Sequence, residues 1–181
     1  MSEDRGNAYP VEVRDEFGAA ALPSEHIAEA IRWVLKQHAA PPGTGVTLVV
    51  TNDEQVRALN AQYRGVDATT DVLSFPADPL PDDLRQAMAE AGDEDAPYLG
   101  DLVVAYPYTA QHAQSAGHAL DDELILLAIH GTLHLLGFDH DSAERQAAMW
   151  ETQNEALVAL GVDLRVPDFT FEDEDAGDER R

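Results

Sequence analysis

The sequence has no cysteine and few basic residues for its length of 181. Without thiols the chain can form neither a disulfide nor a thiolate metal site, so a zinc ion would need histidine or carboxylate ligands. The 11 basic residues, of which only Lys36 is a lysine, face 35 acidic ones, for a formal net charge of −24. That balance argues against a protein that coats nucleic acid through a broad basic field.

Long hydrophobic runs are also missing. The longest apolar stretch, 124–136, is interrupted by two histidines and is too short to span a bilayer. The first ten residues contain neither the basic nor the apolar segment that secretory signals carry. We therefore expect a cytoplasmic protein with no membrane part, and the absence of cysteine fits a reducing compartment.

The length and the hydrophobic content of 44% predict one domain with a substantial core. We assign this domain to residues 8–165, after a disordered N-terminus at 1–7. Two acidic segments, 78–97 and 166–181, are predicted to be a loop excursion within the domain and a disordered tail after it.

Apolar periodicity predicts about four strands and about five helices. In the helix that opens near Asn52 or Asp53, the expected apolar face consists of Val56, Leu59 and Tyr63. Because strands and helices do not alternate strictly, the predicted fold class is a single α+β domain. The predicted strands are 8–14, 46–51, 70–75 and 99–106, and the predicted helices open near residues 24, 53, 107, 121 and 142.

The segment 130–140 reads HGTLHLLGFDH and spaces three histidines suitably for one metal ion. His130 and His134 are four residues apart in a predicted helix, so their imidazoles leave the same face one turn apart. Gly137 ends the helix, and a left-handed glycine there lets His140 fold back toward the same point. Three imidazole nitrogens can hold one Zn²⁺ at about 2.0–2.1 Å and leave a fourth position for water. The pKa of such a water falls toward about 7.

The alternative is that these are helix and cap histidines that bind no metal, but the spacing favours a metal site. The same spacing matches the metzincin protease signature H-E-x-x-H-x-x-G-x-x-H at every position except one. Where those proteases carry the glutamate that acts as general base, this chain has Gly131. The three metal-binding histidines of such a peptidase are therefore present, but its general-base glutamate is absent, which disfavours peptide hydrolysis.

The sequence resembles the YbeY family of bacterial rRNA maturation factors, described as single-strand-specific, metal-dependent endoribonucleases. Two blocks carry the resemblance, HGTLHLLGFDH at 130–140 and LNAQYRGVDATTDVLSFP at 59–76. Gly100-Asp101 and the helix that leads into the first block also fit, so the likeness extends over about residues 8–162.

The resemblance implies a mixed sheet surrounded by helices, with one zinc ion held by His130, His134, His140 and a water. It implies an endoribonuclease that matures the 3′ end of 16S rRNA and takes part in ribosome quality control. The implied partners are single-stranded rRNA of the pre-ribosomal small subunit and ribosomal or assembly proteins, with no role for DNA or a membrane.

Arg64 matches the characteristic arginine of that family. A guanidinium can clamp phosphate oxygens through two hydrogen bonds and offset the charge that develops during attack. The alternative is a surface arginine that interacts with the dipole at a helix C-terminus. A cationic strip of Arg32, Lys36, Arg57 and Arg64 is a further hypothesis, since the sequence does not decide whether the four share a face.

Several polar residues near the motifs have structural and functional interpretations. Asp71 and Ser74 are predicted to be cap or sheet-edge groups. Asp139 either orients a ligand histidine or helps to cap the last helix, where Asp141 and Glu144 resemble a capping box. His118 is predicted to lie at a helix end or on the surface, and the pattern suggests no partner for His26, His38 and His112.

Two other functions stay open. The chain could be a non-catalytic ribosome assembly factor in which zinc serves structure or RNA positioning, and such a factor would share every motif above. It could also be a degenerate metzincin-like peptidase, which the glycine at position 131 disfavours.

Overall fold

The computed structural model describes residues 9–78 and 97–164. The predictions for 1–7, for the excursion at 78–97 and for the tail at 166–181 therefore lie outside the described residues, except at Asp78 and Pro97. The described elements are β1 (Val11–Asp15), α1 (Ser24–Gln37), β2 (Gly45–Thr51), α2 (Asp53–Arg64), β3 (Val72–Pro76), β4 (Tyr98–Ala105), α4 (Tyr106–Ala116), α5 (Leu120–Leu135) and α6 (Ala143–Ala159).

The four strands form one mixed sheet in the order β1-β2-β4-β3. Strands β1, β2 and β4 are parallel, whereas β3 runs antiparallel to β4 at the edge. Apolar runs at 48–50 in β2 and 102–105 in β4 suit strands buried on both faces, and the terminal Pro76 suits an edge strand. The sheet and the five described helices confirm the predicted α+β fold.

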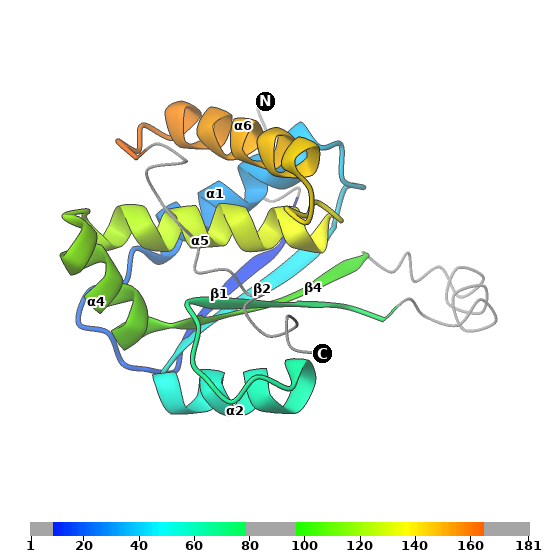
Figure 1. The fold of residues 1–181 in the computed structure, drawn as a ribbon. Helices are drawn as coiled ribbons and strands as arrows, with labels where there is room; N and C mark the ends of the chain where they lie inside the picture. The colour runs from blue at the N-terminus through cyan, green and yellow to red at the C-terminus, as the bar shows by residue number, and fades with distance from the viewer. Residues whose placement is uncertain (1–8, 79–96, 165–181) are drawn as a thin grey trace.

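Helices cover both faces of the sheet. Helices α1, α5 and α6 lie over one face, and α2 lies against the other (Figure 1). Helix α5 runs between the sheet and α6, and twelve of its 16 residues are buried. A helix that is apolar on every side belongs in a core, and α5 is the centre of this one.

The end of α5 is a Schellman turn. The backbone N–H of Gly137 donates to the carbonyl of His134, and that of Phe138 donates to the carbonyl of Leu133, both at 3.0 Å. Gly137 has a φ of 93°, in the region that favours glycine. The turn reverses the chain directly after the two helical histidines, as the sequence predicts.

Two local predictions differ from the structure. The N-cap of α6 is Ser142, whose side chain accepts from the backbone of Arg145, whereas Asp141 accepts from the Arg145 guanidinium. Tyr63, expected on the apolar face of α2, is 62% exposed. The helix buries only Val56 and Asn60, so its inward face is narrower than the pattern suggests. Among the described residues, none of the helices is long and apolar enough to cross a membrane.

Candidate metal centre

The three predicted histidines converge in space. His130 and His134 project from the last turns of α5, and their Nε2 atoms are 3.0 Å apart. His140 follows the Schellman turn, and one ring nitrogen from each histidine lies within 4.8 Å of the others. This geometry confirms that the three side chains together could hold one metal ion.

A residue that no sequence motif indicated holds His130, the most buried of the three histidines. The Nδ1 atom of His130 lies 2.8 Å from Oε1 of Gln153, a fully buried residue of α6. The amide oxygen can only accept, so Nδ1 carries the proton and Nε2 keeps a lone pair for a ligand. Burial above all, together with the neighbouring imidazole of His134, lowers the pKa of His130 well below its usual range. The ring is therefore neutral, as metal binding requires.

Asp139 holds the backbone of His140, the third candidate ligand. Its Oδ1 accepts the backbone N–H of His140 at 2.7 Å. Ser142, and not Asp139, provides the side-chain cap of α6. Of the two interpretations of Asp139, the structure thus favours a role in positioning His140, through the backbone of that residue.

Gly131 lies on the face of α5 that packs against β3 and β4. A Cβ atom there would be 2.7 Å from Cδ2 of Leu102 in β4 and 3.3 Å from Oγ of Ser74 in β3. Ser74 in turn donates to the carbonyl of Gly131 at 3.3 Å. The position that carries the general base in metzincins therefore faces packed side chains, and any side chain there would require Leu102 to shift.

The histidines open onto a pocket of about 360 Å³ between the end of α5, strand β3 and the end of α2. Arg64 is the last residue of α2, it is exposed, and it lines this pocket. Asp71 lines the pocket too, while its Oδ1 accepts the backbone N–H of Val72 at 2.7 Å, which fits the predicted structural role. The remaining lining residues are Tyr63, Val72, Leu73, Ser74, Phe75 and Pro76.

The predicted cationic strip is wrong, because its members lie on opposite faces of the sheet. Arg32 and Lys36 belong to α1, whereas Arg57 and Arg64 belong to α2 (Figure 1). Arg32 pairs with Glu25 and Arg57 with Asp67, at 2.9 and 2.8 Å. Of the four, only Arg64 lines the metal pocket.

Two of the histidines without a predicted partner have one. His112 of α4 lies 2.5 Å from the buried carboxylate of Glu123 in α5, and His38 packs edge-on against Phe138. His118 follows the end of α4 and is half-buried, and His26 is exposed. These contacts join different elements of the fold, so the local spacing of residues within one element could not reveal them.

The fold and the site define the class of the protein. It is a single α+β domain with an open three-histidine centre, the arrangement in which metal-dependent hydrolases hold a catalytic ion. A family model described as "Endoribonuclease YbeY" matches residues 13–161. The chain belongs to the YbeY family, and this membership confirms the prediction of an enzyme of the hydrolase class.

Proteins named Endoribonuclease YbeY are similar over most of the chain. The protein from Chloroflexus aurantiacus is 36% identical over 152 residues, which are 84% of this chain and 95% of that protein. The protein from Moorella thermoacetica is 41% identical over 145 residues, which are 78% and 90% of the two chains. The solution structure of TM1509 from Thermotoga maritima shares the fold, with a TM-score of 0.53, 23% identity, and coverage of 94% of this chain and 99% of that one.

Proposed function

We propose that this chain is a zinc-dependent endoribonuclease that cuts single-stranded RNA in the cytoplasm and matures the 3′ end of 16S rRNA. The observation that carries the proposal is the pocket in which Arg64 lies beside His130, His134 and His140. Membership of a family whose relatives are named endoribonucleases supports RNA as the substrate.

The donor set of the pocket suits zinc. Imidazole nitrogens are good zinc ligands, and Gln153 leaves the Nε2 atom of His130 facing that of His134. When bound, a zinc ion with three protein ligands supplies Lewis acidity and a water whose pKa is lowered toward about 7. Imidazoles also suit nickel, copper and iron, so metal analysis of the purified protein has to decide the identity.

Arg64 binds and orients the phosphodiester in this proposal. Its guanidinium offers donors in a planar fork that matches two phosphate oxygens. Because Arg64 lines the same pocket as the histidines, it can offset the negative charge that grows on the phosphate during attack. Arg64 is exposed, so a substrate can reach it from solvent.

We further propose that the substrate is presented by the pre-ribosomal small subunit, with ribosomal or assembly proteins as docking partners. A net charge of −24 repels RNA at long range. Docking to a protein partner raises the effective concentration of the RNA at the pocket without a basic surface.

The proposal is tested by cleavage of single-stranded rRNA fragments with highly purified protein. We expect a chelator or His134→Ala to abolish cleavage, and added zinc to restore the chelated wild type. Arg64→Ala is expected to lower kcat by about 100- to 1,000-fold, the usual effect of losing a charge-stabilising donor. The matched controls are Arg57→Ala on the same helix and the exposed His26→Ala, which both lie outside the pocket.

Two outcomes would overturn the enzyme proposal. If His134→Ala cuts as well as the wild type, the activity comes from a contaminant. If the zinc-loaded wild type cuts no RNA, while a strain that lacks the gene accumulates 16S rRNA with unprocessed 3′ ends, the chain is a non-catalytic assembly factor. Cleavage of casein-type substrates would instead revive the peptidase hypothesis.

A further inference from the structure

Tyr63 is the most exposed aromatic side chain among the described residues, at 62%. The other two exposed tyrosine or phenylalanine rings in the described part of the chain each have polar or aromatic partners. Phe17 stacks on Tyr106, and the hydroxyl of Tyr98 donates to or accepts from Thr47 and Asp101. Tyr63 belongs to neither hydrophobic core cluster, so most of its ring stays accessible to a ligand.

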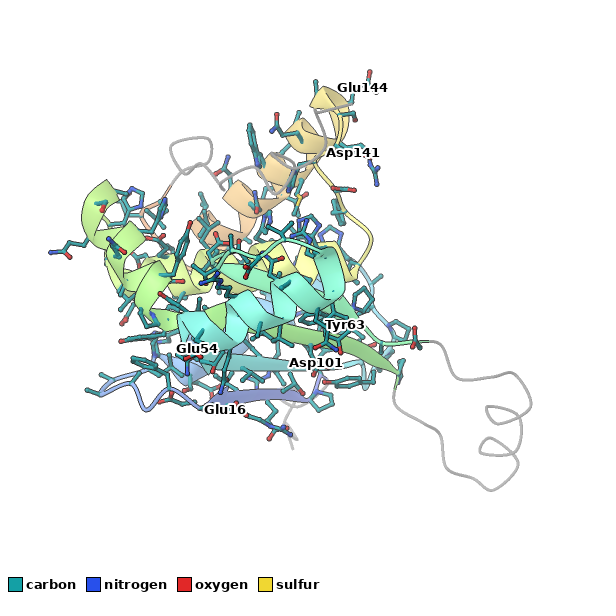
Figure 2. All side chains as sticks on the ribbon, turned by 60° about the horizontal axis from the view of Figure 1, so that its bottom comes forward. Glu16, Glu54, Tyr63, Asp101, Asp141 and Glu144 are labelled. Carbon is teal, nitrogen blue, oxygen red and sulfur yellow. The ribbon has the colours of Figure 1, made fainter. Side chains whose placement is uncertain are left out.

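Tyr63 lies at the mouth of the candidate active site. It precedes Arg64 in the last turn of α2 and lines the same pocket as the three histidines (Figure 2). Its ring contacts that of Phe75 in β3 edge-on, with ring centroids 5.2 Å apart and an interplanar angle of 69°. The contact braces an exposed ring against the edge strand, beside the side chain proposed to bind phosphate.

From this arrangement we propose that Tyr63, braced by Phe75, is a platform on which an unpaired nucleobase of the substrate stacks while Arg64 holds a neighbouring phosphate. The proposal rests on the proposed function and supplies its selectivity for single strands. Bases in a duplex are already stacked on their neighbours, whereas bases in loops and ends are free to stack on an aromatic side chain.

The acidity of the molecule favours such a contact. With a net charge of −24, the chain gains no general attraction for a polyanion. Within the pocket, Arg64 offers one cation, and stacking on Tyr63 adds affinity that does not depend on charge. Stacking on an aromatic side chain contributes about 1–3 kcal/mol per base, which corresponds to about 5- to 150-fold in affinity.

The test measures KM and kcat for cleavage of a short single-stranded RNA by four variants of the full chain. We expect Tyr63→Ala and Tyr63→Leu to raise KM by about 5- to 150-fold, because leucine keeps apolar bulk but has no aromatic face. Tyr63→Phe and Tyr63→Trp are expected to stay within about threefold of the wild type, because both keep an aromatic ring. Phe17→Ala removes an exposed aromatic outside the pocket and is the matched control.

An abasic substrate separates stacking from a structural role of Tyr63. RNAs that lack one base at successive positions around the cut are compared on wild type and Tyr63→Ala. At one position, removing the base should raise the KM of the wild type as much as Tyr63→Ala does. At that position, removing the base should not raise the KM of Tyr63→Ala any further. Equal losses for both proteins at every position would overturn the platform, and so would an unchanged KM for Tyr63→Ala.

Salt dependence gives a second readout that a folding defect would not reproduce. The loss caused by Tyr63→Ala should be the same at low and high salt, whereas the loss caused by Arg64→Ala should shrink as salt rises. If the wild type neither binds nor cuts single-stranded RNA, the platform and the proposed function fail together. If the wild type cuts and Tyr63→Ala equals it, only the platform fails.

Discussion

The hydrogen bond from His130 to Gln153 fixes which nitrogen of that imidazole faces the pocket. Gln153 belongs to α6 and reaches the ligand across the interface with α5. A buried acceptor of this kind holds the ring at one orientation and raises its basicity toward a metal ion. The candidate metal site therefore depends on a residue 23 positions along the chain from His130.

Replacing Gln153 should weaken metal binding directly, and should affect catalysis only through that loss of metal. We expect Gln153→Met to lower zinc affinity by about 10- to 100-fold, because methionine preserves volume but leaves Nδ1 of His130 without an acceptor. Competition with a fluorescent chelator measures the affinity, and circular dichroism checks the fold. Gln153→Glu keeps an acceptor oxygen and should retain zinc, as should Glu155→Ala on the exposed side of α6. Unchanged affinity in Gln153→Met would contradict this role.

The buried carboxylate of Glu123 should make stability depend on pH. Burial raises the pKa of Glu123, and the hydrogen bond to His112 only partly offsets that effect. Because the folded-state pKa lies above the unfolded one, the stabilising contribution is complete at low pH and is lost as pH rises through the folded-state pKa.

Urea unfolding from about pH 5 to pH 8 tests this dependence. Relative to the wild type, Glu123→Gln should gain stability as pH rises, because glutamine has no proton to lose and keeps an acceptor for His112. The exposed Glu29→Gln is the control and should show no such trend. A constant difference between Glu123→Gln and the wild type across the range would refute the assignment.

At the scale of elements, the Schellman turn after α5 connects helix stability to the metal site. Gly137 has a φ of 93°, which a residue with a Cβ adopts only with strain. The same turn sets the direction in which the chain leaves toward His140. Strain at Gly137 should therefore lower the stability of α5 and also displace His140, the third candidate ligand.

Gly137→Ala should destabilise the fold by about 1–2 kcal/mol and also weaken zinc binding. Gly117→Ala is the matched control, because Gly117 ends α4 with a φ of 75° and lies outside the metal pocket. We expect Gly117→Ala to cost similar stability while zinc affinity stays unchanged. Denaturant unfolding and chelator competition measure the two quantities, and equal zinc affinities for the two variants would disprove the coupling.

Local patterns predicted most of these elements, and tertiary packing accounts for what they missed. Helix pitch and one glycine are local properties, so the convergence of His130, His134 and His140 could be read from eleven residues. The contacts of Gln153 and Glu123 cross between helices, and no spacing along the chain records them. The exposure of Tyr63 was missed for the same reason, because the sheet, a tertiary partner, determines which part of α2 is covered.

At the scale of the whole molecule, the acidity of the chain should set the salt response of RNA binding. If Arg64 makes the main phosphate contact, the logarithm of affinity for a single strand should fall with the logarithm of salt at a slope of about −0.7 or less steeply. Salt also screens the repulsion between RNA and the net charge of −24 on the chain, and this screening raises affinity as salt increases, against the decline. Fluorescence anisotropy across a salt series measures the slope, and a slope steeper than about −3 would reveal a basic surface that binds several phosphates.

Helix α5 has a consequence for how such a molecule can diverge. Two of the three candidate ligands, His130 and His134, project from a helix that is enclosed on nearly every side, so substitutions that change the candidate ligands also disturb the core. The rim formed by α2 and β3 is less constrained at Tyr63, because that side chain faces solvent. Related enzymes can therefore change the aromatic side chain at that rim while inheriting the interior almost unaltered, and new substrate preferences should arise there first.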